Sequence, residues 1–185
     1  VADTLAHFGQ IDILVNNAGT ATSNSLAKIK LTEWEHIMAV NATGTFLCTQ
    51  SMMPEMAEQR WGRVVNVASV AGLKGAKYVS AYTAAKHAVV GFTRSIAAEA
   101  EGTGVTVNAV CPGYVDTPLT DETIARIMAR TGKSRDDALI AILEQSGQPR
   151  LIRAEEVAGA ILKLCEDSAS DTNGEVVILD GKDTP

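Results

Sequence analysis

The apolar residues of this chain fall into short continuous runs, separated by longer stretches with helical spacing. Val- and Ile-rich runs bounded by Gly, Asn or Pro predict buried strands, and they lie at residues 11–15, 63–68, 105–110 and 175–179. Apolar residues spaced three and four apart predict helices, over about residues 32–59, 80–101, 121–130, 134–144 and 154–167. Strands that alternate with helices pair in parallel through right-handed crossovers. We therefore expect an α/β fold with a doubly wound parallel sheet.

Local signals refine the boundaries of these elements. Thr32 and Glu35 have the spacing of a capping box, which predicts that the first long helix starts at Thr32. Pro54 is expected to bend or break that helix. The charged, Gly-containing region around the two shorter helices predicts a mobile lid at about residues 114–150.

Composition narrows the class of protein. The 185 residues suggest a single domain, residues 1–185, and 46% hydrophobic with 21% charged residues is an ordinary globular balance. The net charge of −6, without a basic run, argues against nucleic-acid binding. No apolar run is long enough to cross a membrane, and residues 1–8 do not resemble a signal peptide. Three widely spaced cysteines predict reduced thiols in a cytoplasmic protein.

Polar and Gly-rich signals follow three of the predicted strands. The segment Asn16-Asn17-Ala18-Gly19 follows the first strand, Ser69 ends the second, and Pro112-Gly113 follows the third. Ligands of parallel α/β sheets bind at the carboxyl ends of the strands. These three signals therefore predict an active site at one edge of the sheet.

The strongest chemical signal is Tyr82-Thr83-Ala84-Ala85-Lys86 on the helix over residues 80–101. Positions i and i+4 share a helix face, so the phenol and the ammonium can point into one cleft. A nearby positive charge favours the phenolate and suits Tyr82 to acid–base chemistry. Taken alone, the same pair is also compatible with an ordinary helix surface. Ser69, thirteen residues before Tyr82, can meet this helix across a loop that contains Gly72 and Gly75.

The combined pattern resembles the short-chain dehydrogenase/reductase family, whose fold is of the Rossmann type. The resemblance covers nearly the whole chain, from about Leu5, and rests on motifs in their family order: residues 16–19, Asn41, Ser69, Tyr82-x-x-x-Lys86 and Pro112-Gly113. It implies that Tyr82 is the proton donor in carbonyl reduction, that Lys86 lowers the pKa of Tyr82, and that Ser69 orients the substrate oxygen. It also implies that Asn41 sits at a helix break and holds a water in a proton relay to Lys86.

The same resemblance implies a nicotinamide cofactor, NAD or NADP, and no metal. Lys86 is implied to bind the ribose hydroxyls. The other implied cofactor-binding residues divide by the part of the cofactor that they face: Asn16, Ala18 and Gly19 along the adenosine side, Pro112 and Gly113 at the nicotinamide, and Val115 and Thr117 at its carboxamide. His7, His36 and His87 show no metal-ligand spacing, which agrees with a metal-free site.

One part of the family pattern is missing. No Gly-x-x-x-Gly-x-Gly turn occurs, and residues 1–8 resemble the end of the helix before the family's fourth strand. We therefore expect the chain to be part of a longer protein that lacks here its first strands and Gly-rich loop. The strand at residues 11–15 is then expected to lie at an open sheet edge, which is an aggregation hazard.

The sequence is compatible with more than one class of substrate. The region over residues 114–152 resembles that of 3-hydroxybutyrate dehydrogenases, and the residues after Tyr82 also resemble polyketide ketoreductases. Ala71 and Val79 stand where the hydroxybutyrate branch has a His and a Lys that hold a carboxylate. This favours a 3-oxoacyl thioester or another larger or neutral ketone. The alternatives are a 3-hydroxybutyrate dehydrogenase-like enzyme and a non-catalytic interaction module. Apolar positions on two sides of both long helices, together with the resemblance, predict a homotetramer.

Overall fold

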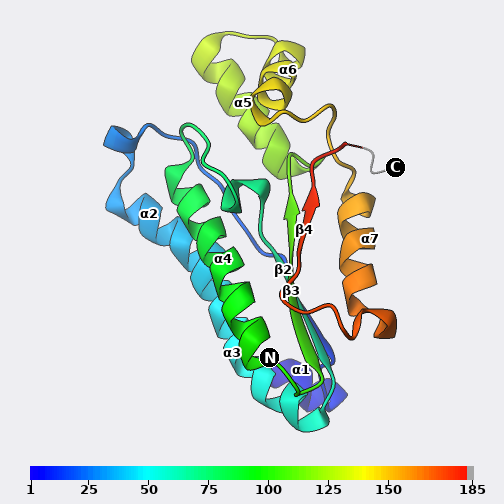
Figure 1. The fold of residues 1–185 in the computed structure, drawn as a ribbon. Helices are drawn as coiled ribbons and strands as arrows, with labels where there is room; N and C mark the ends of the chain where they lie inside the picture. Colours follow the sequence, from blue (N-terminus) through cyan, green and yellow to red (C-terminus); the bar gives the residue numbers. More distant parts are fainter. Residues whose placement is uncertain (183–185) are drawn as a thin grey trace.

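The computed structural model describes residues 1–182 and contains one parallel sheet with strands in the order β1-β2-β3-β4 (Figure 1). The strands are β1 Ile13–Asn16, β2 Gly62–Val67, β3 Val105–Pro112 and β4 Val176–Leu179. Each pairs in parallel with its neighbour, for example Ile13 with Arg63 and Val65 with Asn108. The expected parallel α/β architecture is confirmed, and the strand bounds lie within a few residues of those expected from the apolar runs.

Helices cover both faces of this sheet (Figure 1). One face carries α2 Leu31–Met38, α3 Gly44–Gln59 and α4 Ser80–Glu99, and the other carries α7 Ala154–Cys165. The core is split accordingly, since neighbouring residues of a strand point to opposite faces. Val64 packs with Met52, Met56 and Val107 on the first face, whereas Val65 packs with Leu164 on the second.

The remaining helices lie outside these layers. Helix α1 Ala2–Phe8 precedes β1, and α5 Pro118–Thr131 and α6 Arg135–Ser146 lie beyond the carboxyl ends of the strands (Figure 1). Helices α5 and α6 pack on each other through Ile124, Ala138 and Ile142. Within residues 1–182 the other helical segments are four short turns: η1 Leu26–Lys28, the π-helical turn η2 Ala39–Thr43, η3 Val70–Gly72 and η4 Asp167–Ala169.

The expected capping box at the start of the first long helix and a break of that helix at Pro54 are not observed. The helix α2 is preceded by Lys30 as its N-cap, and Thr32 lies inside it, so the capping box does not form. Glu33 instead accepts hydrogen bonds from Thr22 and Asn24, which ties the start of α2 to the loop after β1. Pro54 does not end the helix, because α3 continues through it to Gln59. The interruption is the π-helical turn at Ala39–Thr43.

A polar ladder joins the first two strands to α3 and α4. The Asn16 side-chain amide donates to Thr49 Oγ1 at 3.0 Å and to Asn66 Oδ1 at 2.8 Å. Asn66, which is fully buried, donates in turn to Thr93 Oγ1 at 2.9 Å. Buried amides that find partners fix one packing arrangement, because any shift leaves them unpaired. The ladder therefore sets how both long helices sit on the sheet.

The strand β1 lies at an edge of the sheet, and Ile13 and Val15 are 43% and 39% exposed. Within residues 1–182, no helix is long and apolar enough to span a bilayer.

Candidate active site

Ser69 stands at the turn between β2 and η3, at the carboxyl end of the sheet. Its backbone is extended, and its hydroxyl caps η3 by accepting a hydrogen bond from the Ala71 N–H at 3.1 Å. The same hydroxyl donates to the Pro112 carbonyl oxygen at 3.4 Å. Ser69 is 8% exposed. The side chain is thus oriented by the turn η3 and by the end of the neighbouring strand β3.

Tyr82, in the first turn of α4, meets Ser69 as expected. The neighbouring Ser69 hydroxyl lowers the pKa of Tyr82, but burial raises it more strongly. The net effect is a pKa above the ordinary value of a phenol. Tyr114 and Cys111 raise it further, because both groups become negative when they lose a proton. This corrects the expectation that Lys86 sets a lowered pKa: in this structure desolvation has the larger effect.

Lys86 lies one turn along α4 from Tyr82 and is 4% exposed. Its Nζ lies 5.7 Å from the centre of the Tyr82 ring and donates to the Val67 carbonyl oxygen at 2.7 Å. Burial lowers the pKa of Lys86 to about 8, because a desolvated ammonium is disfavoured. The cation is therefore held at the end of β2, beside the phenol.

Asn41 lies inside the π-helical turn, so the expected helix break is confirmed. The side chain is 1% exposed and donates to the Thr20 and Ile37 carbonyl oxygens, both at 2.9 Å. Its Oδ1 accepts from the Thr20 N–H at 3.3 Å. The Thr45 hydroxyl donates to the Asn41 carbonyl oxygen at 2.9 Å, which supplies a partner within the widened turn. Asn41 thus fastens the loop after β1 to the break in the helix.

Gly19 lies close to both Asn41 and Lys86. A methyl group on Gly19 would lie 3.0 Å from Asn41 Oδ1 and 3.6 Å from Lys86 Nζ. A side chain here would press against the Asn41 amide oxygen, so the close approach requires glycine. The sequence alone did not single out Thr20, whose backbone holds Asn41 in place.

Gly72 sets the distance between the Ser69 turn and α4. A methyl group on Gly72 would lie 2.6 Å from the Lys86 carbonyl oxygen, inside van der Waals contact. Gly75, in the same loop, has nothing within 4 Å of the corresponding position. Close backbone packing at Gly72 therefore lets η3 and α4 approach, and this approach brings Ser69 to Tyr82.

The other residues expected at the cofactor lie at the same edge of the sheet. Ala18 and Gly19 are exposed in the loop after β1, and Pro112 ends β3. Val115 forms a parallel bridge with Ile152, and Thr117 is the N-cap of α5. The side chain of Asn16 points into the polar ladder, so only its backbone is free to approach a ligand.

Tyr114 is a site residue that the sequence did not reveal. It packs against the cluster formed by Ile124, Ala138 and Ile142, and so connects α5 and α6 to the carboxyl end of β3. Burial raises the pKa of Tyr114, and its hydroxyl lies near enough to Tyr82 to raise the pKa of that residue too.

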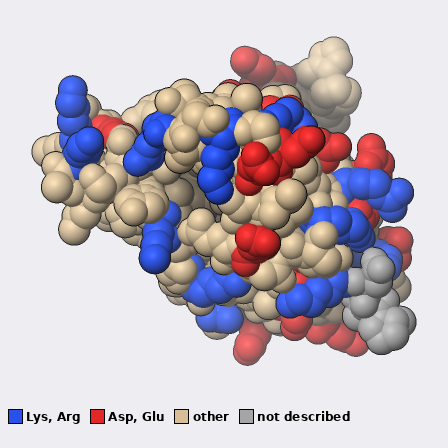
Figure 2. All heavy atoms as spheres, turned by 90° about the horizontal axis from the view of Figure 1, so that it is seen from above, with Lys and Arg blue, Asp and Glu red and all other residues tan. Residues whose placement is uncertain are grey.

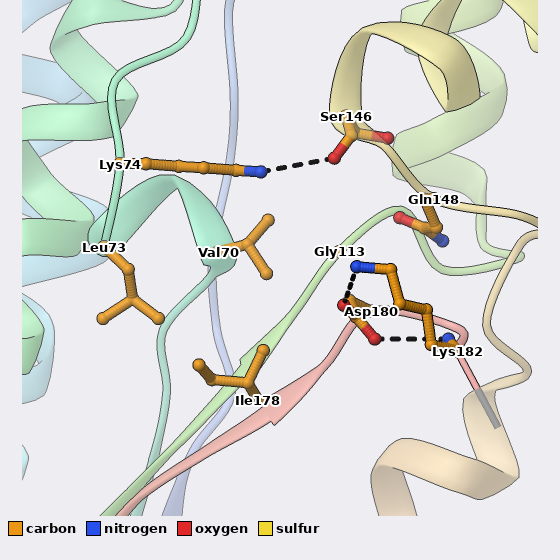
Figure 3. A pocket seen from close by; sticks show the side chains of 9 residues that line it. All are labelled: Val70, Leu73, Lys74, Gly113, Ser146, Gln148, Ile178, Asp180 and Lys182. Carbon is orange, nitrogen blue, oxygen red and sulfur yellow. Dashed lines mark hydrogen bonds and ion pairs between the residues drawn. The ribbon is translucent and has the colours of Figure 1, made fainter. Parts of the chain in front are cut away.

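A cavity of about 240 Å³ lies beside the site (Figure 3). Val70, Leu73 and Ile178 are among its apolar lining residues, and Gln148 and Gly113 lie close together on its far side. Lys74 reaches across it and donates to the Ser146 carbonyl oxygen at 3.2 Å, near the C-terminal end of α6. Ser69, Tyr82 and Lys86 do not line it. The cavity thus lies between the turn η3 and the C-terminal end of α6.

Seen from above the carboxyl ends of the strands, basic and acidic side chains are interspersed (Figure 2). This face does not present a block of one charge, so long-range steering of a charged ligand has no strong source here.

Comparison with known proteins decides the family. The family model for short chain dehydrogenases matches residues 1–127. The chain belongs to the short-chain dehydrogenase family. D-beta-hydroxybutyrate dehydrogenase of Rhizobium meliloti is 39% identical over 187 residues, which cover 98% of this chain and 72% of that protein. A 3-oxoacyl-[acyl-carrier-protein] reductase of Synechocystis is 38% identical over 182 residues, which cover 98% of this chain and 68% of that protein.

Comparison with solved structures supports the same family. Levodione reductase superposes with a TM-score of 0.90 at 34% identity, over 97% of this chain and 69% of that one. A variant of actinorhodin polyketide ketoreductase solved with NADPH superposes with a TM-score of 0.91 at 33% identity. The match covers 97% of this chain and 70% of that one. This short-chain dehydrogenase is therefore an oxidoreductase that interconverts alcohol and ketone groups with NAD or NADP.

The residues present fit a nicotinamide nucleotide. An ammonium carries three N–H donors, and one of those on Lys86 is used by the Val67 carbonyl oxygen. The backbone of Gly19 approaches the ammonium closely, because a methyl group on Gly19 would lie 3.6 Å from Lys86 Nζ. A buried cation at this edge of the sheet, with N–H donors beyond the one that Val67 accepts, suits the hydroxyl groups of a ribose.

Proposed function

We propose that this short-chain dehydrogenase reduces a 3-oxoacyl thioester or a similar neutral ketone, with Tyr82 as the acid. The observation that carries the proposal is the triplet at the sheet edge. The Ser69 hydroxyl lies beside Tyr82 and lowers the pKa of the phenol, and the Lys86 ammonium lies 5.7 Å from the Tyr82 ring centre. A carbonyl oxygen that accepts from both hydroxyl groups has its proton source at hand.

The proposed cofactor contacts follow the sheet edge. Lys86 binds the ribose hydroxyls; Asn16, Ala18 and Gly19 lie along the adenosine side through their backbone. Pro112 and Gly113 line the nicotinamide, and Val115 and Thr117 bind its carboxamide. When bound, the nicotinamide exchanges a hydride at its C4 with the substrate carbon.

The protein's own part is the movement of a proton. Tyr82 is a neutral phenol at neutral pH and holds the proton to be donated. Because burial raises its pKa, release of this proton depends on the charge that develops on the substrate oxygen and on the nearby ammonium. As the substrate oxygen gains negative charge, Ser69 stabilises it by a hydrogen bond and Tyr82 transfers its proton to it. The phenolate that remains is stabilised by the Lys86 ammonium. Asn41 holds a water that passes a proton back through Lys86. In alcohol oxidation the same steps run in reverse.

The substrate class is inferred from two apolar positions beside this triplet. Ala71 follows Ser69 in η3, and Val79 is the N-cap of α4. Neither can bind a carboxylate, so a small free acid has no charged anchor at these positions. A larger or neutral ketone needs none. Helices α5 and α6 cover the substrate as a lid within residues 114–150.

The substrate proposal is tested by comparing a neutral 3-oxo thioester with acetoacetate. We expect kcat/KM for the thioester to be higher by about tenfold or more, since burying an unpaired carboxylate is costly. A double variant, Ala71→His with Val79→Lys, is expected to gain activity on acetoacetate. Higher turnover of acetoacetate by the unsubstituted protein would instead favour a 3-hydroxybutyrate dehydrogenase-like enzyme.

We also propose that the protein assembles as a homotetramer. Phe46 on α3 and Phe92 on α4 form an edge-to-face ring pair at 6.1 Å, and Phe46 and Leu47 are 41% and 50% exposed. Exposed apolar side chains on two adjacent helices favour association with a second copy. Light scattering is expected to give four subunits, and Leu47→Glu to reduce that number. A monomer at micromolar concentration would contradict the proposal.

The cytoplasm is the proposed location. The cysteines Cys48, Cys111 and Cys165 are free thiols, which is compatible with a reducing compartment. Fractionation of the native cell tests this proposal, and recovery in a secreted fraction would contradict it.

A further inference from the structure

The side-chain amide of Gln148 pairs with the backbone of Tyr114 in the way that a neighbouring strand would. Gln148 Oε1 accepts from the Tyr114 N–H at 2.8 Å, and Nε2 donates to the Tyr114 carbonyl oxygen at 2.8 Å. Nε2 also donates to the Arg150 carbonyl oxygen at 2.6 Å. Gln148 is 6% exposed, so water cannot readily replace these three bonds.

Gly113 completes this arrangement. A methyl group on Gly113 would overlap Gln148 Oε1, so the glutamine fits only against a glycine. Figure 3 shows the two residues together above the ends of the strands. On its other side, the Gly113 N–H donates to the Leu179 carbonyl oxygen at 2.8 Å. The turn after β3 is therefore held between β4 and the Gln148 side chain.

The clamped turn adjoins the reacting groups. The Pro112 carbonyl oxygen, directly before the clamped Gly113, accepts from the Ser69 hydroxyl at 3.4 Å. In the proposed function Pro112 and Gly113 also line the nicotinamide. A shift of this turn would therefore move the ring away from the substrate carbon while leaving the adenosine side of the cofactor unchanged.

We infer that Gln148 is a positioning residue, which fixes the turn after β3 so that the nicotinamide meets the substrate beside Ser69 and Tyr82. The inference rests on the proposed function. Only a primary amide supplies this pattern, one acceptor and two donors in one plane. A glutamate would set a carboxylate against two carbonyl oxygens. A methionine would remove the side-chain partner of the Tyr114 N–H and leave the Tyr114 carbonyl oxygen with the Ile152 N–H alone.

The test compares Gln148→Glu and Gln148→Met in the full chain with a matched control, Gln59→Met. Gln59 is the last residue of α3 and is exposed, so its replacement is expected to leave all readouts unchanged. A displacement of reacting groups by about 1 Å can cost a hundredfold in rate. We expect kcat of both Gln148 variants to fall about tenfold to a hundredfold. The primary deuterium isotope effect with 4-deuterated NAD(P)H should rise.

Binding measurements separate positioning from a general loss of structure. The Gln148 variants should bind NAD(P)H more weakly, yet bind ADP-ribose, which lacks the nicotinamide, as the unsubstituted protein does. Equal losses for both ligands, or kcat and isotope effect unchanged in a folded Gln148→Met variant, would overturn the inference. If neither variant folds, Gln148 serves folding and the inference is also overturned.

Failure of the proposed function gives a different result. In that case the unsubstituted protein transfers no hydride to any ketone, whatever the residue at position 148. If the unsubstituted protein is active and Tyr82→Phe abolishes that activity, the proposed function stands. The Gln148 variants then decide the inference alone.

Discussion

The Lys86 ammonium lies 5.7 Å from the centre of the Tyr82 ring and donates to the Val67 carbonyl oxygen at 2.7 Å. A positive charge is thereby buried beside a neutral phenol, with a strand-end carbonyl oxygen as its protein partner. Burial costs the protein stability, because the ammonium loses its hydration. The same placement stabilises the phenolate that forms when Tyr82 gives up its proton. The buried ammonium thus lowers the stability of the fold while it favours proton transfer from Tyr82.

This cost predicts how stability depends on pH. The pKa of Lys86 is about 8 in the folded protein and 10.5 as its ordinary value. Between these values the unfolded chain binds a proton that the folded protein does not, so the free energy of unfolding rises with pH. The unsubstituted protein should gain about 2 kcal/mol between pH 7 and pH 10 relative to Lys86→Met. Urea unfolding of both proteins at the two pH values measures the difference.

Tyr82 and Cys111 act in the opposite direction. Their raised pKa values mean that the folded protein keeps protons that the unfolded chain loses at high pH, which lowers stability there. Both residues remain in Lys86→Met, so their effect largely cancels in the comparison. A pH-independent difference between the two proteins would show that the Lys86 ammonium is not desolvated.

Two glycines of one loop should respond differently to the same substitution. Gly72→Ala places a methyl group 2.6 Å from the Lys86 carbonyl oxygen, whereas the corresponding position at Gly75 is open. We expect Gly72→Ala to destabilise the protein by about 1–3 kcal/mol and to lower kcat, because η3 must move away from α4 and takes Ser69 with it.

Gly75→Ala is the control and should change neither stability nor kcat appreciably. Thermal unfolding and steady-state kinetics of the two variants provide the comparison. Equal behaviour of the two variants would contradict the role assigned to the close contact at Gly72.

The sequence predicted the sheet because its signals are local. Runs such as residues 63–68 and 105–110 are apolar and β-branched, and the parallel order follows from the helices between them. Ser69, Tyr82 and Lys86 were predictable because strand ends and helical spacing bring them together, and the structure confirms their meeting. The helix break at Asn41 followed only from the family resemblance.

The remaining features depend on tertiary contacts. Thr32 fits a capping box, but the chain before it enters α2 two residues earlier, with Lys30 as the N-cap. The pKa of Tyr82 is set by burial, which no spacing of residues reveals. Gln148 gives no local signal, since its partners at Tyr114 lie 34 positions away.

Asn41 offers a test of the helix break. Asn41→Ala would leave the Thr20 N–H and the Thr20 and Ile37 carbonyl oxygens without their side-chain partner. Unpaired buried groups are costly, so we expect a loss of about 2 kcal/mol or more in the free energy of unfolding. Gln50→Ala, at an exposed position of α3, is the matched control. Urea unfolding measures the free energy of unfolding of both variants. If Asn41→Ala destabilised the protein no more than Gln50→Ala does, the π-helical turn would not depend on Asn41.

The central claim is that Tyr82 donates the proton to the substrate oxygen. Tyr82→Phe removes that proton while keeping the ring, and Tyr78→Phe makes the same change at a residue that is 55% exposed. The decisive measurement is kcat for NAD(P)H-dependent reduction of a neutral 3-oxo thioester by the two folded variants. The account predicts a loss of about a thousandfold for Tyr82→Phe and near-normal turnover for Tyr78→Phe. Turnover by Tyr82→Phe within a few-fold of the unsubstituted protein would contradict it.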